Sequence, residues 1–312
     1  MGYTCTMTAT ESSREQPRTV GEALQYCSEV LEKSAVHFGH GTDNAWDEAA
    51  QLVFFVAELP LESDDSVLRQ PLSSNAVARL LSYLDQRVTQ KLPLPYLLHR
   101  AWFAGLEFCC DQRAIIPRSP IAELILGDFQ PWYSGDSPKR ILDLCCGGGC
   151  IGLAVAHYFP DAHVDLLDID SAALALAREN AVLLGVEDRV TIRESDLFAA
   201  LRDERYDLIL SNPPYVDAAD LASMPAEYHH EPERALGSGE DGLDLTRRIL
   251  RSAGAFLHDD GVLIVEVGNS WPALEEAYPQ VPFTWIEFEH GGEGVFTLTA
   301  RELREYSTSW RE

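Results

Sequence analysis

The stretch RILDLCCGGGC, residues 140–150, decides the fold, because an apolar run leads through glycines into a segment with helical spacing. Apolar runs of this kind then alternate with helical segments, as buried parallel strands alternate with their crossover helices. The runs are RILDLCC (140–146), AHVDLLD (162–168), RVTIRES (189–195), YDLILS (206–211) and GVLIVEV (261–267), and the helical segments lie near 150–158, 171–184, 241–257 and 271–278. The sequence therefore predicts an α/β fold with a doubly wound, mostly parallel sheet.

The last two apolar runs indicate a different connection. FTWIEF (283–288) and VFTLT (295–299) are separated by a short turn that contains Gly291, Gly292 and Gly294. A link this short can join only antiparallel strands. We therefore expect the parallel sheet to end in an antiparallel terminal hairpin.

The first hundred residues predict helices rather than strands. Thr19 and Glu22 have the spacing of a capping box, in which each side chain satisfies the other's backbone N–H at the start of a helix. Asn44 can cap a second helix, and Ser73 or Ser74 a third. Strand-like alternation is absent from this part of the sequence, which therefore predicts a small N-terminal helical domain.

The residue pattern changes from helical to strand-like before the α/β part begins. Aromatic and apolar residues on either side of Gly105 predict two short strands around a glycine turn. The chain is thus expected to have three parts, a helical domain over 1–95, a hairpin linker over 96–120 and the α/β domain over 121–312.

Composition excludes several classes of protein. The chain has 24 Lys and Arg against 50 Asp and Glu, a net charge of −26. This charge repels nucleic acids and anionic membranes and favours basic partners, so we expect no direct nucleic-acid substrate. No stretch reaches the ~20 apolar residues of a membrane-spanning helix, and the N-terminus lacks the apolar core of a signal peptide. The expectation is a cytoplasmic protein with no membrane contact.

The seven cysteines do not indicate a disulfide framework or a metal site. An odd number of cysteines without an export signal favours free thiols. Cys145, Cys146 and Cys150 lie close in the sequence, but their spacing is not that of a zinc site. We therefore predict no bound metal.

A glycine-rich loop follows the first strand of the α/β part and contains Asp143, Cys145, Gly147 and Gly149. Glycines let backbone N–H groups approach a ligand closely, and the helix N-terminus beyond them favours an electron-rich group. Taken alone, the loop is equally consistent with a tight structural turn.

Acidic residues end the next two strands. Asp168 is placed to accept hydrogen bonds from the ribose hydroxyls of a nucleoside, with Asp170 as an alternative. Asp196 could meet the adenine amino group, and Leu197 could cover the ring. Because the carboxyl ends of parallel strands share one edge of the sheet, these residues predict an adenine nucleoside site. They leave open whether the ligand is a dinucleotide or S-adenosylmethionine.

The tetrapeptide Asn212-Pro213-Pro214-Tyr215 directly follows the fourth strand. A residue before proline is held extended, so Asn212 and Pro213 display their carbonyls in fixed directions. The Asn212 side-chain oxygen and the Pro213 carbonyl suit the two N–H bonds of a planar –NH2 group, and Tyr215 offers an aromatic face against which that group can stack. A proline-rich strand terminator would not explain this order of residues.

NPPY after the fourth strand, the DxxxGxG loop, the acidic second strand and the terminal hairpin together resemble class I S-adenosylmethionine-dependent methyltransferases that act on planar nitrogen. The resemblance implies S-adenosyl-L-methionine as the cofactor. Cys145 departs from the pattern, because the first loop glycine usually stands there. The implied cofactor-binding residues are Asp143, Cys145, Gly147, Gly149, Asp168, Asp196, Leu197 and Asn212; Asn212, Pro213, Pro214 and Tyr215 would bind the substrate, and Asn212, Pro213 and Tyr215 would be catalytic.

Longer strings narrow the resemblance. Residues 93–118 and 212–250 resemble the bacterial protein-glutamine methyltransferases. The branch that modifies the large-subunit ribosomal protein L-three, rather than the release-factor branch, is indicated by GHGTDNAWDEA (39–49), AWFAG (101–105), PRSPIAELI (117–125), HEPE (230–233) and EVGNS (266–270). The resemblance implies methyl transfer to the N(5) amide nitrogen of a glutamine in that basic ribosomal protein.

Three other functions compete with this interpretation. A release-factor glutamine methyltransferase is the nearest alternative. A nucleic-acid amino methyltransferase would need basic grooves, which the charge of −26 disfavours. A ribosome-assembly factor that has lost its chemistry is disfavoured by the intact NPPY tetrapeptide.

Overall fold

The computed structural model describes residues 16–135 and 137–311, which fall into two compact units. The smaller unit ends at Leu98 and leaves out Gly39–Gly41. These three residues belong, with His99 and the residues after it, to the larger unit.

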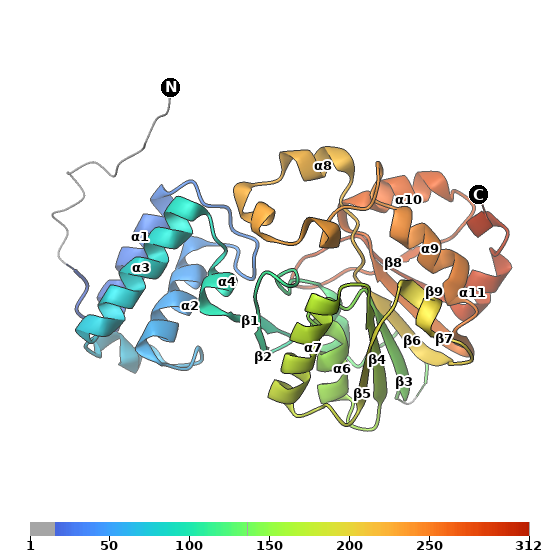
Figure 1. The fold of residues 1–312 in the computed structure, drawn as a ribbon, viewed down its shortest axis with the longest axis horizontal. Coiled ribbons are helices and arrows are strands. Elements are labelled where there is room, and N and C mark those ends of the chain that lie inside the picture. The colour runs from blue at the N-terminus through green and yellow to red at the C-terminus, as the bar shows by residue number, and fades with distance from the viewer. Residues whose placement is uncertain (1–15, 136, 312) are drawn as a thin grey trace. The chain divides into compact units, whose positions relative to one another are not determined.

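The smaller unit is helical, as the sequence predicts (Figure 1). Its residues pack around one apolar core to which all four α-helices contribute. The elements are α1 (Val20–Lys33), α2 (Ala45–Ala57), the 3-10 helix η1 (Asp65–Arg69), α3 (Ser74–Gln90) and α4 (Leu94–Leu98).

The predicted helix starts are confirmed in the smaller unit. The side chains of Thr19, Asn44 and Ser73 each accept a backbone N–H in the first turn of α1, α2 and α3. The capping box is only half formed, because the Glu22 carboxylate accepts the backbone N–H of Arg18 at 2.7 Å instead of that of Thr19. The N–H that donates to the Glu22 carboxylate thus belongs to the residue before the one that the pattern predicts.

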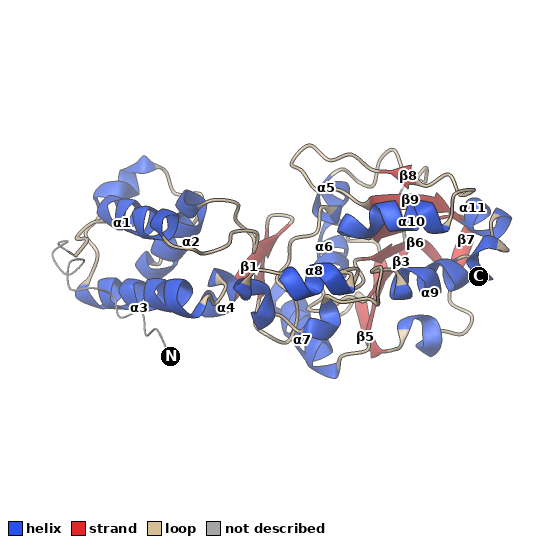
Figure 2. Cartoon of the chain, turned by 90° about the horizontal axis from the view of Figure 1, so that it is seen from above, coloured by secondary structure: helices blue, strands red, loops and turns tan. Residues whose placement is uncertain are grey.

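The larger unit contains a seven-stranded sheet in the order β5-β4-β3-β6-β7-β9-β8 (Figure 2). The first five strands of that order are parallel, and β9 runs antiparallel to both of its neighbours. A separate antiparallel pair, β1 (Arg100–Phe103) and β2 (Leu106–Cys109), confirms the hairpin expected around Gly105. The sheet strands are β3 (Arg140–Leu144), β4 (His163–Asp168), β5 (Val190–Glu194), β6 (Tyr206–Ser211), β7 (Leu257–Glu266), β8 (Thr284–Trp285) and β9 (Val295–Thr299).

Helices cover both faces of this sheet (Figure 1). Because neighbouring side chains of a strand point to opposite faces, Ile141 joins one apolar core and Leu142 the other. The first core is closed by α5 (Ile121–Leu126), α6 (Cys150–Tyr158) and α7 (Ser171–Leu184), and the second by α9 (Asp244–Ala253), α10 (Trp271–Ala277) and α11 (Ala300–Glu305). The short helix α8 (Ala218–Ser223) lies in the long connection between β6 and α9. The predicted doubly wound fold is confirmed.

The terminal antiparallel pairing is also confirmed, but its outer strand is shorter than predicted. Only Thr284 and Trp285 form β8, where the sequence predicts a strand over 283–288. The Ile286 N–H still donates to the Val295 carbonyl of β9 at 2.9 Å, and beyond the predicted strand the N–H groups of Glu289 and His290 donate to the carboxylate of Glu123 on α5, at 2.8 and 3.3 Å. The chain therefore leaves the sheet after Ile286 and is held at residues 289 and 290 by a side chain distant in the sequence.

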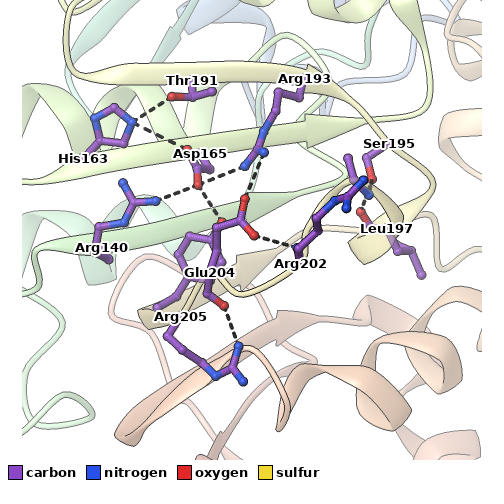
Figure 3. Close-up of polar contacts among 12 residues, drawn as sticks. Arg140, His163, Asp165, Thr191, Arg193, Ser195, Leu197, Arg202, Glu204 and Arg205 are labelled. Atoms are coloured by element: carbon purple, nitrogen blue, oxygen red, sulfur yellow. Dashed lines mark hydrogen bonds and ion pairs between the residues drawn. The ribbon is translucent and has the colours of Figure 1, made fainter.

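A buried carboxylate ties four strands of the sheet together (Figure 3). Asp165 on β4 is 2% exposed and accepts hydrogen bonds from Arg140 at 2.9 Å, Arg193 at 3.3 Å and the Tyr206 hydroxyl at 2.6 Å. These partners come from β3, β5 and β6.

No helix within residues 16–135 and 137–311 has both the length and the apolar character needed to cross a membrane.

Candidate functional site

The strand order reverses between β3 and β6. After β3, the chain first adds β4 and β5 on one side of it, and then adds β6 and β7 on its other side. Loops that leave two such strands diverge and open a crevice at their carboxyl ends, where open α/β sheets bind ligands. The glycine loop follows β3 and the NPPY tetrapeptide follows β6. The hydroxyl of Ser211 donates to the Leu144 carbonyl at 2.8 Å and fastens the two strand ends together.

The glycine loop adopts a conformation that the residue types permit. Gly147 and Gly149 have φ values of 53° and 84°, in the left-handed region that glycine tolerates. A Cβ at Gly149 would lie 2.9 Å from Leu153 Cδ1 and 3.1 Å from Ala177 Cβ. Gly149 is therefore needed both for its backbone and for close packing of α6 and α7. Cys145 shares the left-handed conformation, with φ 58°.

Asp143 organises this loop from beneath. Its side chain is fully buried, and Oδ2 accepts the backbone N–H of Gly152 in the first turns of α6 at 2.8 Å. The other oxygen, Oδ1, is buried without a hydrogen-bond partner in the described part of the chain. Burial raises the pKa of Asp143 to about 7.

Asp168 lies at the end of β4 and faces the glycine loop. Its Oδ2 accepts the Gly147 N–H and its Oδ1 the Asp170 N–H, both at 2.8 Å. Each oxygen keeps one further lone pair. Asp170 is committed elsewhere, since it caps α7 through the Ala172 N–H and pairs with Arg234 at 3.3 Å.

A cavity of about 210 Å³ opens at these strand ends. Pro214 lines it, whereas Asp143, Gly149, Pro213 and Tyr215 do not. The other predicted site residues that line this cavity are Cys145, Gly147, Asp168, Asp196, Leu197 and Asn212.

The turn that carries Leu197 is held by a side-chain hydrogen bond (Figure 3). Ser195 donates its hydroxyl to the Leu197 carbonyl at 2.6 Å and accepts the Ala200 N–H at 3.0 Å. Leu197 takes a left-handed φ of 50°. This turn places the Leu197 side chain in the wall of the cavity.

Sequence reasoning missed three arginines that line the cavity, Arg113, Arg234 and Arg248. Arg248 on α9 donates to Asp196 Oδ1 at 2.7 Å, so one oxygen of the predicted adenine contact is already engaged. Ion pairs between residues this far apart in the chain leave no local pattern that could reveal them.

The other two arginines are also paired. Arg234 contacts Asp170, and Arg113 binds the carboxylates of Asp111 and Glu179 at 2.7 Å. Among the cavity carboxylates in the described residues, Asp168 alone has no arginine partner. It is therefore the lining carboxylate best placed to receive a ligand.

Asn212 stands where two cavities meet. A second, smaller cavity of about 40 Å³ shares Ile115, Cys145, Gly147 and Asn212 with the first. Pro213 is buried behind Asn212, so the backbone on both sides is fixed. An amide held at this junction can contact groups in either cavity.

Tyr215 is locked in place rather than lying in the cavity wall. Its ring lies so close to Gly268 that a Cβ there would be 2.4 Å from Cε2. Its hydroxyl donates to Glu266 Oε1 at 2.9 Å, and its carbonyl accepts the Ser270 hydroxyl at 2.7 Å. Burial, with the neighbouring Glu266 charge, raises the pKa of Tyr215 well above its usual value.

An ion pair with a fully buried carboxylate and a partly buried guanidinium anchors the connection between β6 and α9. Arg118 donates to both oxygens of Glu231, at 2.6 and 2.7 Å, and the Ile116 N–H adds a third hydrogen bond at 2.9 Å. The Arg118 guanidinium lies 5.4 Å from the centre of the Tyr228 ring, and the ring of His40 lies 4.5 Å from the same ring. The HEPE string singled out in the sequence thus holds this connection to the segment before α5.

The cysteines of the loop are neutral thiols. Together with Cys109 and Cys110 they line the smaller cavity, and burial raises the pKa of Cys110, Cys145, Cys146 and Cys150 far above neutral pH. Within the residues that the structure describes, no group of three or more potential ligands is arranged to hold a metal ion. The thiols therefore pack as small apolar groups.

Comparison with known proteins identifies the family. The model of the methyltransferase small domain matches residues 123–229. The ribosomal protein uL3 glutamine methyltransferase of Francisella tularensis is 45% identical over 94% of this chain and 94% of its own. The enzyme of the same name from Xanthomonas campestris is 43% identical over 96% of both. The chain belongs to the family of ribosomal protein uL3 glutamine methyltransferases. The methyltransferase predicted from NPPY and the longer strings is confirmed at the level of the family.

A solved structure supports the same fold. The catalytic domain of hMettl16, in complex with MAT2A 3'UTR hairpin 6, aligns with a TM-score of 0.50 over 72% of this chain and 81% of its own, at 16% identity. At this identity the likeness concerns the fold alone. It is consistent with the class I methyltransferase architecture predicted from the strand order.

Proposed function

We propose that this protein transfers a methyl group from S-adenosyl-L-methionine to the N(5) amide nitrogen of a glutamine in ribosomal protein uL3, and that it does so in the cytoplasm. The observation that carries the proposal is the position of Asn212 at the junction of two cavities. Its amide is fixed because strand β6 precedes it and two prolines follow it. The names of relatives that match along almost the whole chain support the choice of substrate.

The larger cavity suits the nucleoside end of this cofactor. The free lone pairs of Asp168 can accept both ribose hydroxyls. The oxygen of Asp196 that Arg248 leaves unused can accept the adenine amino group. The side chains of Leu197 and the half-exposed Ile169, which also line the cavity, can enclose the ring.

Charge favours a cationic ligand over a dinucleotide. Asp168 carries a carboxylate without an arginine partner among the described residues and receives the Gly147 N–H that a pyrophosphate would need. A pyrophosphate placed there would meet like charge. A sulfonium compound would meet the opposite charge. Of the two ligands that the sequence left open, these charges therefore favour S-adenosylmethionine over a dinucleotide. When bound, S-adenosylmethionine supplies an electrophilic methyl group.

On the substrate side, Asn212 and Pro213 would act as acceptors. An amide nitrogen is a weak nucleophile because its lone pair is delocalised into the carbonyl. The Asn212 side-chain oxygen and the Pro213 carbonyl would accept its two N–H bonds and aim the nitrogen at the methyl group, with Pro214 and Tyr215 fixing the amide plane. Alignment of this kind lowers a barrier by ~7–11 kcal/mol at best. The proton of the acidic methylated amide can leave to water.

The helical unit and the surface charge would serve recognition of the protein substrate. The helical domain predicted over 1–95, to which we assign recognition of the protein substrate, includes most of the smaller helical unit. Ribosomal proteins are typically basic, so a net charge of −26 would steer one toward the enzyme and disfavour RNA. Association that slows steeply with added salt would support this role.

A methylation assay tests the proposal. Purified enzyme is incubated with methyl-labelled S-adenosylmethionine and either uL3 or a peptide chain release factor, and mass spectrometry locates the label. We expect one methylated glutamine in uL3, and none when Asn212→Ala replaces the wild-type enzyme. Label on the release factor alone, or undiminished turnover by Asn212→Ala, would contradict the proposal.

A further inference from the structure

Glu266 is a buried carboxylate beside the proposed catalytic amide. It ends β7, and the parallel register that pairs Ser211 with Val265 brings Glu266 next to Asn212. The residue is 5% exposed. Such burial of a carboxylate is costly unless its oxygens receive hydrogen bonds.

Two side chains donate hydrogen bonds to Glu266, and a third lies beside it. The Ser119 hydroxyl donates to Oε2 at 2.6 Å and the Tyr215 hydroxyl to Oε1 at 2.9 Å. The side chain of Asn212, which the strand register places beside Glu266, also acts to lower the pKa of this carboxyl. Ser119 has little choice of direction, because its oxygen already accepts the Ile121 N–H at 3.2 Å. Ser119 thus fixes one oxygen of Glu266, and the carboxylate can orient the side chains of Tyr215 and Asn212 on its other side.

The chemistry of a carboxylate determines how Asn212 is oriented. An ionised carboxylate only accepts hydrogen bonds, so Asn212 must present its –NH2 group to Glu266. The side-chain oxygen of Asn212 then lies on the side away from Glu266. The reversed amide would set two acceptors against each other.

We propose that Glu266 is a positioning residue, which holds the Asn212 amide with its oxygen toward the substrate nitrogen. The proposal rests on the proposed function for its catalytic meaning, since methyl transfer to an amide needs an acceptor at this point. Glu266 itself does not touch the substrate. It acts through Asn212 and through the hydroxyl of Tyr215.

Protonation of Glu266 would remove this control. Burial raises the pKa of Glu266, although its hydrogen bonds and the Arg118 guanidinium act in the other direction. The titratable groups that face it are Arg118, Tyr215 and Cys150. As the pH falls through a raised pKa, the carboxyl gains an O–H donor at a higher pH than an exposed glutamate would. Turnover should therefore decline on the acid side.

The kinetic test replaces Glu266 with glutamine, which keeps the shape but introduces a donor. We expect Glu266→Gln to lower kcat about 100-fold, the cost of a slightly misplaced group, with the KM for uL3 and the Kd for S-adenosylmethionine unchanged. It should also lose the acid-side decline. Wild-type kcat in the folded variant, or an equal loss of cofactor binding, would overturn the proposal.

Glu123→Gln is the matched control. The Glu123 carboxylate also accepts two hydrogen bonds, from the backbone of Glu289 and His290, but it does not contact the NPPY tetrapeptide. It should keep the wild-type kcat and pH profile. A loss of kcat in Glu123→Gln equal to that in Glu266→Gln would show a general effect of losing a carboxylate and would overturn the proposal.

A measurement without substrate separates this inference from the proposed function. The chain has five asparagines, so selective 15N-asparagine labelling gives few side-chain amide signals, and Asn212→Ala identifies the pair from Asn212. In the wild-type protein this pair should shift as Glu266 titrates, and Glu266→Gln should abolish the shift. Signals that ignore pH would overturn the orientation. A clear shift in an enzyme that does not methylate uL3 would retain the orientation and reject the proposed function.

Discussion

Asp168→Ala provides the sharpest test of how the cofactor is held. The substitution removes two acceptors proposed for the ribose hydroxyls, and hydrogen bonds to a charged group each contribute about 1.5–3 kcal/mol. Together the two give ~3–6 kcal/mol, a loss of at least ~100-fold in affinity. The same substitution frees the Gly147 N–H, which Asp168 now holds at 2.8 Å, and loosens the glycine loop. Isothermal calorimetry with S-adenosylmethionine measures the change directly.

Asp170→Ala is the control for this prediction, because Asp170 also ends the same strand loop and was the alternative ribose ligand. It loses an exposed pair with Arg234 and the cap of α7, so unfolding should cost ~1 kcal/mol less while the Kd changes by less than about threefold. An unchanged Kd for Asp168→Ala, or a larger effect from Asp170→Ala, would refute the assignment of the ribose to Asp168.

Three further predictions concern stability and the loop. Arg118→Met or Glu231→Gln alone should each lower the free energy of unfolding by about 3–5 kcal/mol, and both together by less than the sum, as urea titration can show. The pKa of Asp143 is higher in the folded protein, about 7, than in the unfolded chain. Its contribution to the free energy of unfolding is therefore fully present below about pH 4 and is lost as the pH rises through about 7. Asp143→Asn should flatten this pH dependence in thermal melts. Gly149→Ala should destabilise the protein by about 1–3 kcal/mol more than Gly185→Ala, whose Cβ meets open space at a similar φ, and should also weaken cofactor binding in calorimetry.

Much of the local structure could be predicted because its causes are local. Thr19, Asn44 and Ser73 cap their helices with bonds that span three residues, and the apolar runs of β3 and β6 mark strands that are buried on both faces. The limits of local reasoning show where distant groups compete. The strand predicted over 283–288 forms only at Thr284 and Trp285, and the Glu123 carboxylate, distant in the sequence, binds the backbone at residues 289 and 290.

The candidate site divides in the same way. Asp168, Asp196, Leu197 and Asn212 could be placed at one edge of the sheet, because parallel strands bring their carboxyl ends together. The environment of each residue could not be predicted. The Arg248 pair at Asp196 arises only when α9 packs against the sheet.

The sequence by itself determined the class of fold, and it predicted which edge of the sheet would bind ligands and which tetrapeptide would face a planar amide, since each follows from residue type and spacing. Only the tertiary structure decided that Tyr215 is tied to Glu266 and that Asn212 has a carboxylate behind it. It also showed that Asp143 supports the loop from a fully buried position. Hydrogen bonds and burial depend on which groups meet in space, and residues far apart in the chain meet only after the sheet has assembled.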